Sequence, residues 1–332
     1  MRPRVLRYGL ALALALLPLL AAAPQAALGQ SITLRIAHTT APTHPYTTMA
    51  QKLAEQVKAK SKGTMNMTIH PASQLGGERD LMEGLQVGTV DMMSCSLGVA
   101  ASFVPELNVL NLPFLFRDAK HYTEVTRGPI GARLLKAVEP KRLVGLGLYA
   151  PVFRVPQNNI RPIASPADFK GLRLRLMEVP LHMDTYKALG ASPVPLPFGE
   201  LYTALQLKTV DGNENAPATL YSERFYEVQK YVSLLPVFSN GAILLMSQAT
   251  WNKLTPAQRD IITGSVPDAL AVGDRDYLAM DEKGLQVMKS HGLQINTPTD
   301  LAPFRAVVKP IYDKYLEKMP AWVKEAFAEI QK

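Results

Sequence analysis

The amino-acid sequence predicts an α/β protein of about two domains, built on mostly parallel sheets. Strand-like and helix-like segments alternate along the chain, which is typical of parallel strands joined by right-handed helical crossovers. The chain has 332 residues, enough for two domains of about 150 residues each. Apolar residues make up 47% of it, so each domain can bury a hydrophobic core.

The N-terminal segment has the three parts of a secretory signal peptide. Arg2, Arg4 and Arg7 precede an apolar run over residues 8–23, and small residues lead up to Gly29. The apolar run is shorter than the roughly 20 residues that a membrane-spanning helix needs, which disfavours an uncleaved anchor. We therefore predict that residues 1–29 are a signal peptide, and that the mature protein is released into the periplasm.

The charge of the chain indicates which partners it can bind, and its cysteine content limits lipid anchors and disulfides. Without the leader, 33 basic and 28 acidic residues leave a net charge of +5, which favours anionic partners. Basic and acidic residues are interspersed and no basic run occurs, so nucleic-acid binding is not expected. Cys95 is the only cysteine, which excludes both a lipid anchor near the leader and an internal disulfide.

The first half of the mature chain alternates strands and helices. Alternating apolar residues predict strands at residues 32–37 and 65–70, and residues 90–95 predict a third strand. Apolar residues at every fourth position predict a helix through residues 49–57, and residues 78–86 predict a second helix. This order, strand, helix, strand, is the basis for expecting parallel pairing.

The second half repeats the alternation. Residues 143–148 and 172–176 predict strands, and residues 181–189 and 199–207 predict helices. No internal repeat and no low-complexity linker marks a boundary between domains.

A long helix is predicted near the C-terminus. Thr255-Pro256-Ala257-Gln258 matches a capping box with proline at the first helical position, and the helical pattern continues to His291. One helix of about 35 residues would span roughly 50 Å, longer than a small domain, and would brace both halves. Three helix-breaking residues lie within this stretch, so a helix interrupted at one of them is an equal alternative; they are Gly264, Pro267 and Gly284.

No enzyme motif is present. The sequence lacks a G-x-S-x-G nucleophile elbow, a phosphate-binding loop and a G-x-G-x-x-G turn. We interpret Gly145-Leu146-Gly147 as a packing feature of a strand. His38 and His44 are interpreted as polar loop residues rather than metal ligands, since no cysteine or carboxylate lies nearby. Because catalytic residues can be dispersed, a periplasmic enzyme acting on a carboxylic acid stays open as an alternative.

Several long segments depart from a generic α/β chain. They are GLRLRLMEVP at 171–180 and GASPVPLPFGELYTALQLKTVDGNENAP at 190–217, with PASQLGGERDLMEGLQVGTVDM at 71–92, VPELNVLNLPFLFRD at 104–118 and FYEVQKYV at 225–232. Together, and in this order, they resemble the solute-binding proteins of tripartite ATP-independent periplasmic (TRAP) transporters, of the DctP type. The resemblance covers essentially the whole mature chain.

The resemblance implies a two-lobed periplasmic binding protein fold, with a ligand cleft between the lobes and a long C-terminal bracing helix. It implies hinges near residues 152 and 240. Lobe I would comprise residues 30–151 and 241–280, and lobe II residues 152–240 and 281–332.

The resemblance also implies a set of ligand-binding residues. Arg175 would pair with the ligand carboxylate through two parallel bonds, since a planar guanidinium matches a carboxylate, whereas Arg173 would be a solvated surface charge. Arg154 and Asn215 would contact the same end of the ligand. Aromatic rings and first-lobe loops would surround the rest; these residues are Phe198, Tyr149, Thr39, Glu78 and Ser96.

This sequence departs from the family pattern at three positions near the ligand, Lys208, Asn213 and Ala216, where the family has glycine, glutamine and proline. Ser96 replaces an acidic residue of the sialic-acid binders, which argues against sialic acid. Ser96 and Val99 suit a keto, hydroxy or aromatic monocarboxylate as well as a dicarboxylate.

The function implied is capture of a small organic acid anion, without catalysis, cofactor or metal, by a monomer that delivers it to TRAP membrane permease subunits. A binding protein of an ATP-driven importer is a second alternative.

Overall fold

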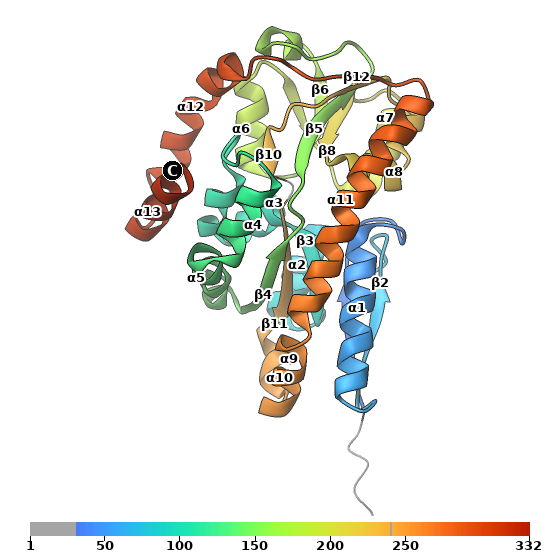
Figure 1. The fold of residues 1–332 in the computed structure, drawn as a ribbon, viewed down its shortest axis with the longest axis vertical. Coiled ribbons are helices and arrows are strands. Elements are labelled where there is room, and N and C mark those ends of the chain that lie inside the picture. Colours follow the sequence, from blue (N-terminus) through green and yellow to red (C-terminus); the bar gives the residue numbers. More distant parts are fainter. Residues whose placement is uncertain (1–30, 240) are drawn as a thin grey trace, which may run out of the picture.

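The computed structural model describes residues 31–239 and 241–332 (Figure 1). The predicted signal peptide and its cleavage site lie outside these ranges. Within them the chain forms two β-sheets, one in each half of the molecule, and helices pack around both. The α/β fold class and the two sheets agree with the prediction from the sequence.

The first sheet has five strands in the order β2-β1-β3-β11-β4. Strands β1 (Ile32–Ala37) and β2 (Met65–His70) have the bounds that their alternating patterns predict, and β3 (Met92–Ser96) starts two residues late. Strand β4 (Leu143–Tyr149) forms one edge. Strand β11 (Ala242–Ser247) comes from far along the chain and lies between β3 and β4.

The second sheet follows the order β12-β9-β5-β8-β6-β7, and β10 pairs with β5. Its strands are β5 (Phe153–Asn158), β6 (Arg173–Leu176), β7 (Ser192–Pro195), β8 (Gly212–Asn215), β9 (Tyr231–Ser233), β10 (Phe238–Ser239) and β12 (Gln294–Asn296). Of these, only β6 is close to a strand that the alternating pattern predicts.

Both sheets are mixed, which corrects the prediction of mostly parallel sheets. Strand β11 is antiparallel to β3 and β4, and β5 is antiparallel to β8, β9 and β10. The remaining pairs are parallel. The chain enters β5 and β11 directly from the other half of the molecule, without the helical crossover that would align them with their neighbours.

Helices pack around both sheets. Those near the first sheet are α1 (Pro45–Lys60), α2 (Glu78–Val87), α3 (Leu97–Phe103), α4 (Ala119–Arg127), α5 (Pro129–Ala137), α9 (Gln248–Lys253) and α10 (Pro256–Thr263), with the 3₁₀ segment η1 (Pro105–Asn111). Those near the second sheet are α6 (Pro180–Ala188), α7 (Leu201–Gln206) and α8 (Pro217–Ser222), with the 3₁₀ segment η3 (Pro166–Phe169).

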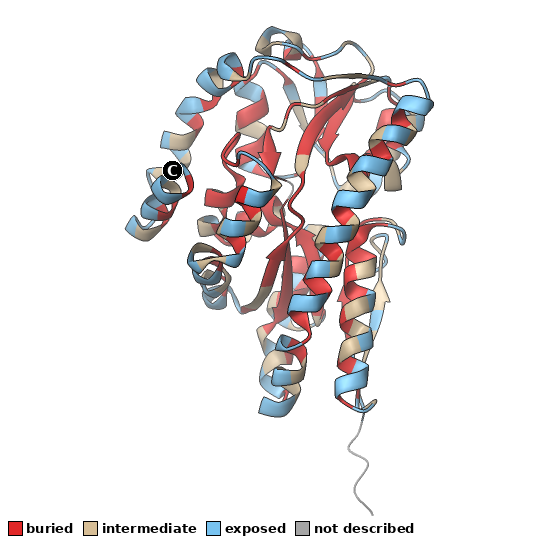
Figure 2. Cartoon of the chain, in the orientation of Figure 1, coloured by how far each residue is buried: buried red, intermediate tan, exposed pale blue. Residues whose placement is uncertain are grey.

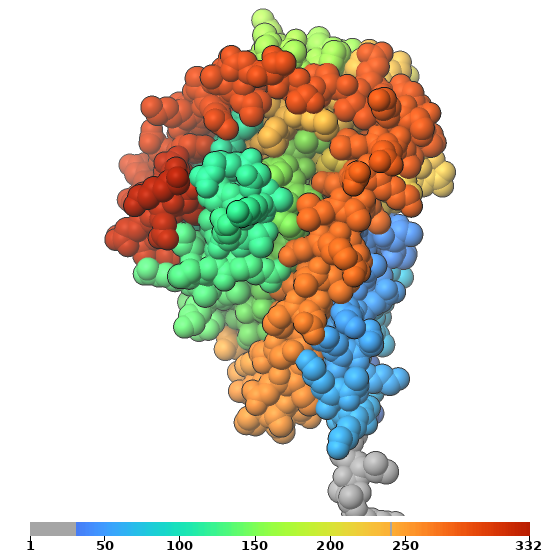
Figure 3. Space-filling view, viewed as in Figure 1, coloured from blue at the N-terminus to red at the C-terminus, as the bar shows by residue number. Residues whose placement is uncertain are grey.

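The predicted long helix is broken once. Thr255 caps α10 with the expected capping box, but the chain leaves the helix at Gly264 and Ser265 before α11 (Val266–Ser290) begins. Helix α11 packs against α1 and β4 on the first half and against α8 on the second. Figure 3 shows it running along the surface from one half to the other, beside α1. It therefore braces the molecule as expected, although over 25 residues.

The backbone between β4 and β5 is held by α11. Ala150 has a φ of 64°, a left-handed conformation that costs energy for a residue with a side chain. Its N–H donates to Asp274 Oδ1 at 2.7 Å, and Arg127 Nη2 donates to Asp274 Oδ2 at 2.7 Å. The crossing between the two sheets is therefore attached to the bracing helix by a buried backbone contact.

Close packing explains the two glycines of β4. A Cβ at Gly147 would lie 2.3 Å from Leu270 Cδ1 on α11, and one at Gly145 would lie 2.6 Å from the carbonyl oxygen of Leu135. The interpretation of this segment as a packing feature is thus confirmed. Buried residues follow the strands and the inner helix faces throughout (Figure 2).

The last two helices pack against different halves of the molecule. Helix α12 (Ala302–Leu316) packs against α6 and η3, whereas α13 (Ala321–Ile330) packs against η1. Tyr312 donates a hydrogen bond to the carbonyl oxygen of Pro113. None of the helices in the described ranges combines the length and apolarity needed to span a membrane.

Candidate functional site

A cavity of about 290 Å³ lies between the two sheets, where strands of both sheets end. From the first half it is lined by Thr39, Thr40, Tyr46, Gly77, Glu78, Arg79, Asp80, Ser96, Val99, Ser102 and Phe103. From the second half it is lined by Arg154, Arg175, Met177, Glu178, Leu196, Pro197, Phe198, Asn215 and Thr219, and Tyr277 comes from α11. The carboxyl ends of β1, β3, β6, β7 and β8 converge here, the usual place for ligands in α/β folds.

Seven of the eight residues predicted to bind a ligand line this cavity; they are Arg175, Arg154, Asn215, Phe198, Thr39, Glu78 and Ser96. Tyr149 is not among the lining residues. It is buried on β4 beside Tyr46, with ring centroids 5.7 Å apart, and its hydroxyl is hydrogen-bonded to Ser94. Tyr149 therefore supports the ring of Tyr46, which lines the cavity.

Arg175 lines the cavity and is itself buried. The side chain is 2% exposed, and its Nε and Nη2 donate to the carbonyl oxygen of Leu196 at 2.8 and 2.6 Å. Nη1 is buried and has no hydrogen-bond partner among the described residues. Phe198 packs beside the guanidinium, whose central carbon lies 5.7 Å from the ring centroid.

Burial, and next the nearby charge of Arg154, lower the pKa of Arg175 to about 10. The guanidinium therefore remains charged at neutral pH. A buried cation with an unpartnered N–H group is favourable only if an anion or water completes its hydrogen bonds. Since Leu196 occupies the Nε edge, a carboxylate could make its two parallel bonds with the Nη1–Nη2 end.

Arg154 is held by a carboxylate beneath the cavity. Its Nε donates to Glu214 Oε2 at 2.5 Å, and its Nη2 donates to Glu214 Oε1 at 3.0 Å and to Asn215 Oδ1 at 2.9 Å. Burial opposes ionisation of Glu214, but Arg154 and then His182 hold its pKa at about 2. The pair is therefore ionised, and it fixes the plane of the Arg154 guanidinium.

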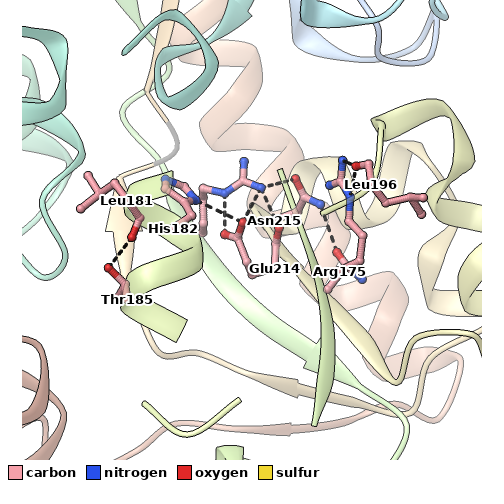
Figure 4. Close-up of polar contacts among 9 residues, drawn as sticks. Arg175, Leu181, His182, Thr185, Leu196, Glu214 and Asn215 are labelled. Carbon is pink, nitrogen blue, oxygen red and sulfur yellow. Dashed lines mark hydrogen bonds and ion pairs between the residues drawn. The ribbon is translucent and has the colours of Figure 1, made fainter. Parts of the chain in front are cut away.

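His182 completes this row of side chains (Figure 4). Its Nδ1 lies 3.5 Å from Glu214 Oε1, and its ring stacks on Phe238 with centroids 3.8 Å apart. Burial lowers the pKa of His182, so the ring is neutral at neutral pH. No local pattern in the sequence marks His182, because its partners lie 32 and 56 positions away.

Asn215 is oriented by its neighbours. Its Nδ2 donates to Asn213 Oδ1 at 3.0 Å while its Oδ1 accepts from Arg154, so Asn213, a departure from the family pattern, positions it. Lys208, where the family has glycine, has a φ of 57°. This left-handed conformation is the one that glycine adopts most easily.

The wall opposite the arginines is built from the first half of the molecule. Glu78 is the first residue of α2, and its Oε1 accepts from the N–H of Ser96 at 2.9 Å. Ser96 ends β3, and its buried hydroxyl has no hydrogen-bond partner among the described residues. Thr39 and Thr40 follow β1 and are also buried.

His38 and His44 lie in the loop between β1 and α1, as interpreted from the sequence, and both are fully buried. His38 is hydrogen-bonded to the hydroxyls of Thr40 and Thr47, each at 3.0 Å. His44 caps α1 by accepting from the N–H of Tyr46, and its Nε2 is hydrogen-bonded to Tyr277 at 2.9 Å and to Thr219 at 3.2 Å. Burial lowers the pKa of both histidines, to about 4 for His38.

The network around His44 joins elements that are distant in the sequence. It brings Tyr46 from α1, Thr219 from α8 and Tyr277 from α11 to one side of the cavity. None of the three was predicted from the sequence as a lining residue. Within residues 31–239 and 241–332, no group of three or more histidine, cysteine, aspartate or glutamate side chains could hold a metal ion.

Comparison with protein families matches residues 36–319 to DctP, the bacterial extracellular solute-binding protein, family 7. The C4-dicarboxylate-binding periplasmic protein DctP of Rhodobacter capsulatus is 30% identical over 311 residues, covering 91% of this chain and 93% of that protein.

Solved structures of similar proteins have the same fold. A TRAP periplasmic solute-binding protein from Polaromonas sp. JS666, bound to D-erythronate, has a TM-score of 0.87 and 34% identity, covering 91% of this chain and 98% of that one. The sugar acid binding protein DctPAm from Advenella mimigardefordensis, in complex with galactonate, has a TM-score of 0.87 and 30% identity with the same coverage.

Proposed function

This chain belongs to family 7 of the bacterial extracellular solute-binding proteins, and on that basis we propose that it captures a small organic acid through its carboxylate for a TRAP transporter. Members of this family are periplasmic substrate-binding proteins rather than enzymes. The similar proteins bind sugar acids and a C4-dicarboxylate, so they support an organic acid without identifying it.

One observation carries the proposal: Arg175 lines the cavity, and one nitrogen of its guanidinium has no hydrogen-bond partner among the described residues. This nitrogen, Nη1, is buried, whereas Arg154 is already engaged by Glu214. A ligand carboxylate at this end of the guanidinium would gain charge-assisted hydrogen bonds in a site that excludes most water. Asn215 and Arg154 lie on the same side of the cavity and would complete the anion site.

We further propose that the ligand is enclosed by two lobes. Lobe I would comprise residues 30–151 and 241–280, and lobe II residues 152–240 and 281–332. The distribution of strands supports this division, since β1 to β4 and β11 form one sheet and the others form the second. The direct connections from β4 to β5 and from β10 to β11 would serve as hinges, near residues 152 and 240; residue 240 itself lies outside the described residues.

The partners would be an organic acid anion and the membrane permease subunits of a TRAP transporter, with the binding protein acting as a monomer. A thermal-shift screen of organic acids, sugars and amino acids tests the capture step. A ligand at a hundredfold excess over its Kd should stabilise the protein by about 2.7 kcal/mol. Stabilisation only by compounds without a carboxylate, or turnover of the stabilising compound, would refute the proposal.

Release into the periplasm would follow removal of the signal peptide. N-terminal sequencing of the exported protein should begin at or near Gln30, since the small residues before it form the cleavage site. A mature product that retains Met1 would show that the leader is not cleaved.

A further inference from the structure

The wall of the cavity opposite Arg175 carries a carboxyl group, that of Glu78. Glu78 lines the cavity, and its carboxylate is held by the N–H of Ser96 at 2.9 Å. The charges of Glu78 and of the two arginines influence each other, so all three groups lie within one electrostatic environment. Arg175 and Glu78 line the same cavity from its two halves, so a ligand that binds Arg175 and fills the cavity meets Glu78.

The cations of the cavity are unevenly placed. Arg154 and Arg175 lie on the second-half wall, and Arg154 is balanced by Glu214. The third cation among the described lining residues, Arg79, has a largely exposed side chain that pairs with Glu83 at 3.2 Å and lies over the ring of Phe103. No inward-facing cation of the described residues is therefore available beside Glu78 for a second anionic group.

Besides Glu78 and Arg79, this wall carries Asp80, whose carboxylate already accepts from the N–H of Gly77 at 2.9 Å, and the remaining polar side chains are neutral. Thr39, Thr40, Ser96 and Ser102 contribute hydroxyls, and the Ser96 hydroxyl is buried without a partner. Hydroxyls can donate or accept, and a carboxylate accepts, so together they match ligand hydroxyl groups. A second ligand carboxylate would instead bring two acceptors of like charge together in a buried site.

We propose that Glu78 makes the cavity selective for monocarboxylates that carry a hydroxyl at the end remote from the carboxylate, and that it excludes the corresponding diacids. This inference rests on the proposed function, because it takes Arg175 as the carboxylate anchor. Burial raises the pKa of Glu78, which shows that a negative charge at this position is already costly before a second one arrives.

The test uses acids that differ only at the remote carbon. Erythronate and meso-tartrate have the same four carbons and differ at C4, which is a primary alcohol in one and a carboxylate in the other. Gluconate and glucarate form the equivalent six-carbon pair, and 4-hydroxybutanoate and succinate form the pair without further hydroxyls. Calorimetric titration at pH 8 gives the affinity ratio, alcohol over diacid, for each pair that binds.

In the wild-type protein the alcohol should bind at least tenfold more tightly than its diacid. Glu78→Gln keeps an oxygen for the N–H of Ser96 but removes the charge, and its amide can donate to a carboxylate. The ratio should therefore fall at least tenfold in this variant. Glu55→Gln is the matched control, because Glu55 lies on α1 in the same half of the molecule, is exposed and does not line the cavity; it should change the ratio less than threefold.

A diacid that binds wild type as tightly as its alcohol, or a ratio that Glu78→Gln and Glu55→Gln change equally, would overturn this selectivity while carboxylate capture stands. If no member of any pair binds, and no other carboxylate does, both the selectivity and the proposed function are wrong. The wild-type ratio decides the matter even if Glu78→Gln fails to fold.

Discussion

Arg173 and Arg175 lie two residues apart on β6 and have opposite surroundings. Arg173 is exposed and pairs with Asp211 at 2.7 Å, whereas Arg175 is buried against the carbonyl oxygen of Leu196. Strand alternation gives both the same parity, so the pattern could not separate them. The difference arises because β6 begins at Arg173, at the sheet's solvent-facing end, and Arg175 lies two residues further toward the cavity.

Arg175→Lys should lose most affinity for a carboxylate ligand while folding normally. A lysine keeps the charge but cannot donate two parallel bonds to a carboxylate. The loss should be about 2 to 4 kcal/mol, roughly 30-fold to several hundredfold in Kd, measured by calorimetric titration.

Arg173→Lys is the control for this change, because it alters the same residue type on the same strand, outside the cavity. Its Kd should stay close to that of wild type, and circular dichroism should show that both variants fold. An Arg175→Lys protein that binds within about threefold of wild type would mean that the carboxylate anchor lies elsewhere.

Glu223 links the two halves of the molecule and should make stability depend on pH. Its Oε1 accepts from the N–H of Ala41 at 2.7 Å, and burial raises its pKa from 4.5 to about 7. Between these values the unfolded carboxyl ionises before the folded one, so stability falls as pH rises. The slope from one group cannot exceed about 1.4 kcal/mol per pH unit.

Glu223→Gln cannot ionise but keeps an acceptor for Ala41. Relative to wild type, the variant should therefore gain stability as pH rises from 5 to 7, and the difference should be constant above pH 8. Urea unfolding at several pH values measures this. Asp281, whose pKa burial also raises to about 7, acts in both proteins and cancels. A stability difference that does not vary with pH would contradict the role of Glu223.

At the scale of elements, the sequence pattern correctly predicted those strands and helix starts that depend on neighbouring residues alone. Strands β1 and β2 have alternating residues and turn signals at both ends, and the capping box at Thr255 starts α10 where expected. Strands β8 and β9 were missed because they are three or four residues long and largely polar or buried on both faces. Their pairing partners, far along the chain, determine their conformation.

In the site, too, residues within recognisable segments were predicted, whereas contacts between distant segments were not. The resemblance located Arg175, Glu78 and Ser96 because each sits in a recognisable segment. The resemblance could not locate the network around His44, since its partners Thr219 and Tyr277 lie 175 and 233 positions away from it. Such contacts follow from the packing of α1, α8 and α11 rather than from any local pattern.

Gly284 allows α11 to approach α8 closely. A Cβ there would lie 2.8 Å from the carbonyl oxygen of Pro217 and 3.0 Å from Tyr221 Cβ. Gly284→Ala gains about 1 kcal/mol of helix propensity but forces the two helices apart, at about 1 to 3 kcal/mol. We expect a net loss of about 1 kcal/mol in the free energy of unfolding, measured by urea denaturation.

Glu282→Ala, two residues away on the exposed face of α11, is the matched control. Its effect should stay within about 0.5 kcal/mol, since it removes no buried contact. Equal effects of the two substitutions would show that close packing at Gly284 does not matter.

For the whole molecule, the proposed hinges predict closure around the ligand. The two crossings lie side by side in the sheets, since β10 pairs with β5 and β11 pairs with β4, so one rotation can use both. Small-angle scattering should give a smaller radius of gyration with a confirmed ligand than without it. At the same ligand concentration Arg175→Lys should show no such change. An equal radius in the presence and absence of ligand would argue against closure.

The position of β11 sets the order in which the molecule can be completed. This strand hydrogen-bonds both β3 and β4 within the first sheet, yet the chain reaches it only after every strand from β5 to β10. During synthesis the edges of β3 and β4 that pair with β11 therefore stay unpaired until residue 247 has left the ribosome. Such long-range pairing is slow to form. A chain in this unfinished state can still be threaded through a narrow pore, as the proposed export would require.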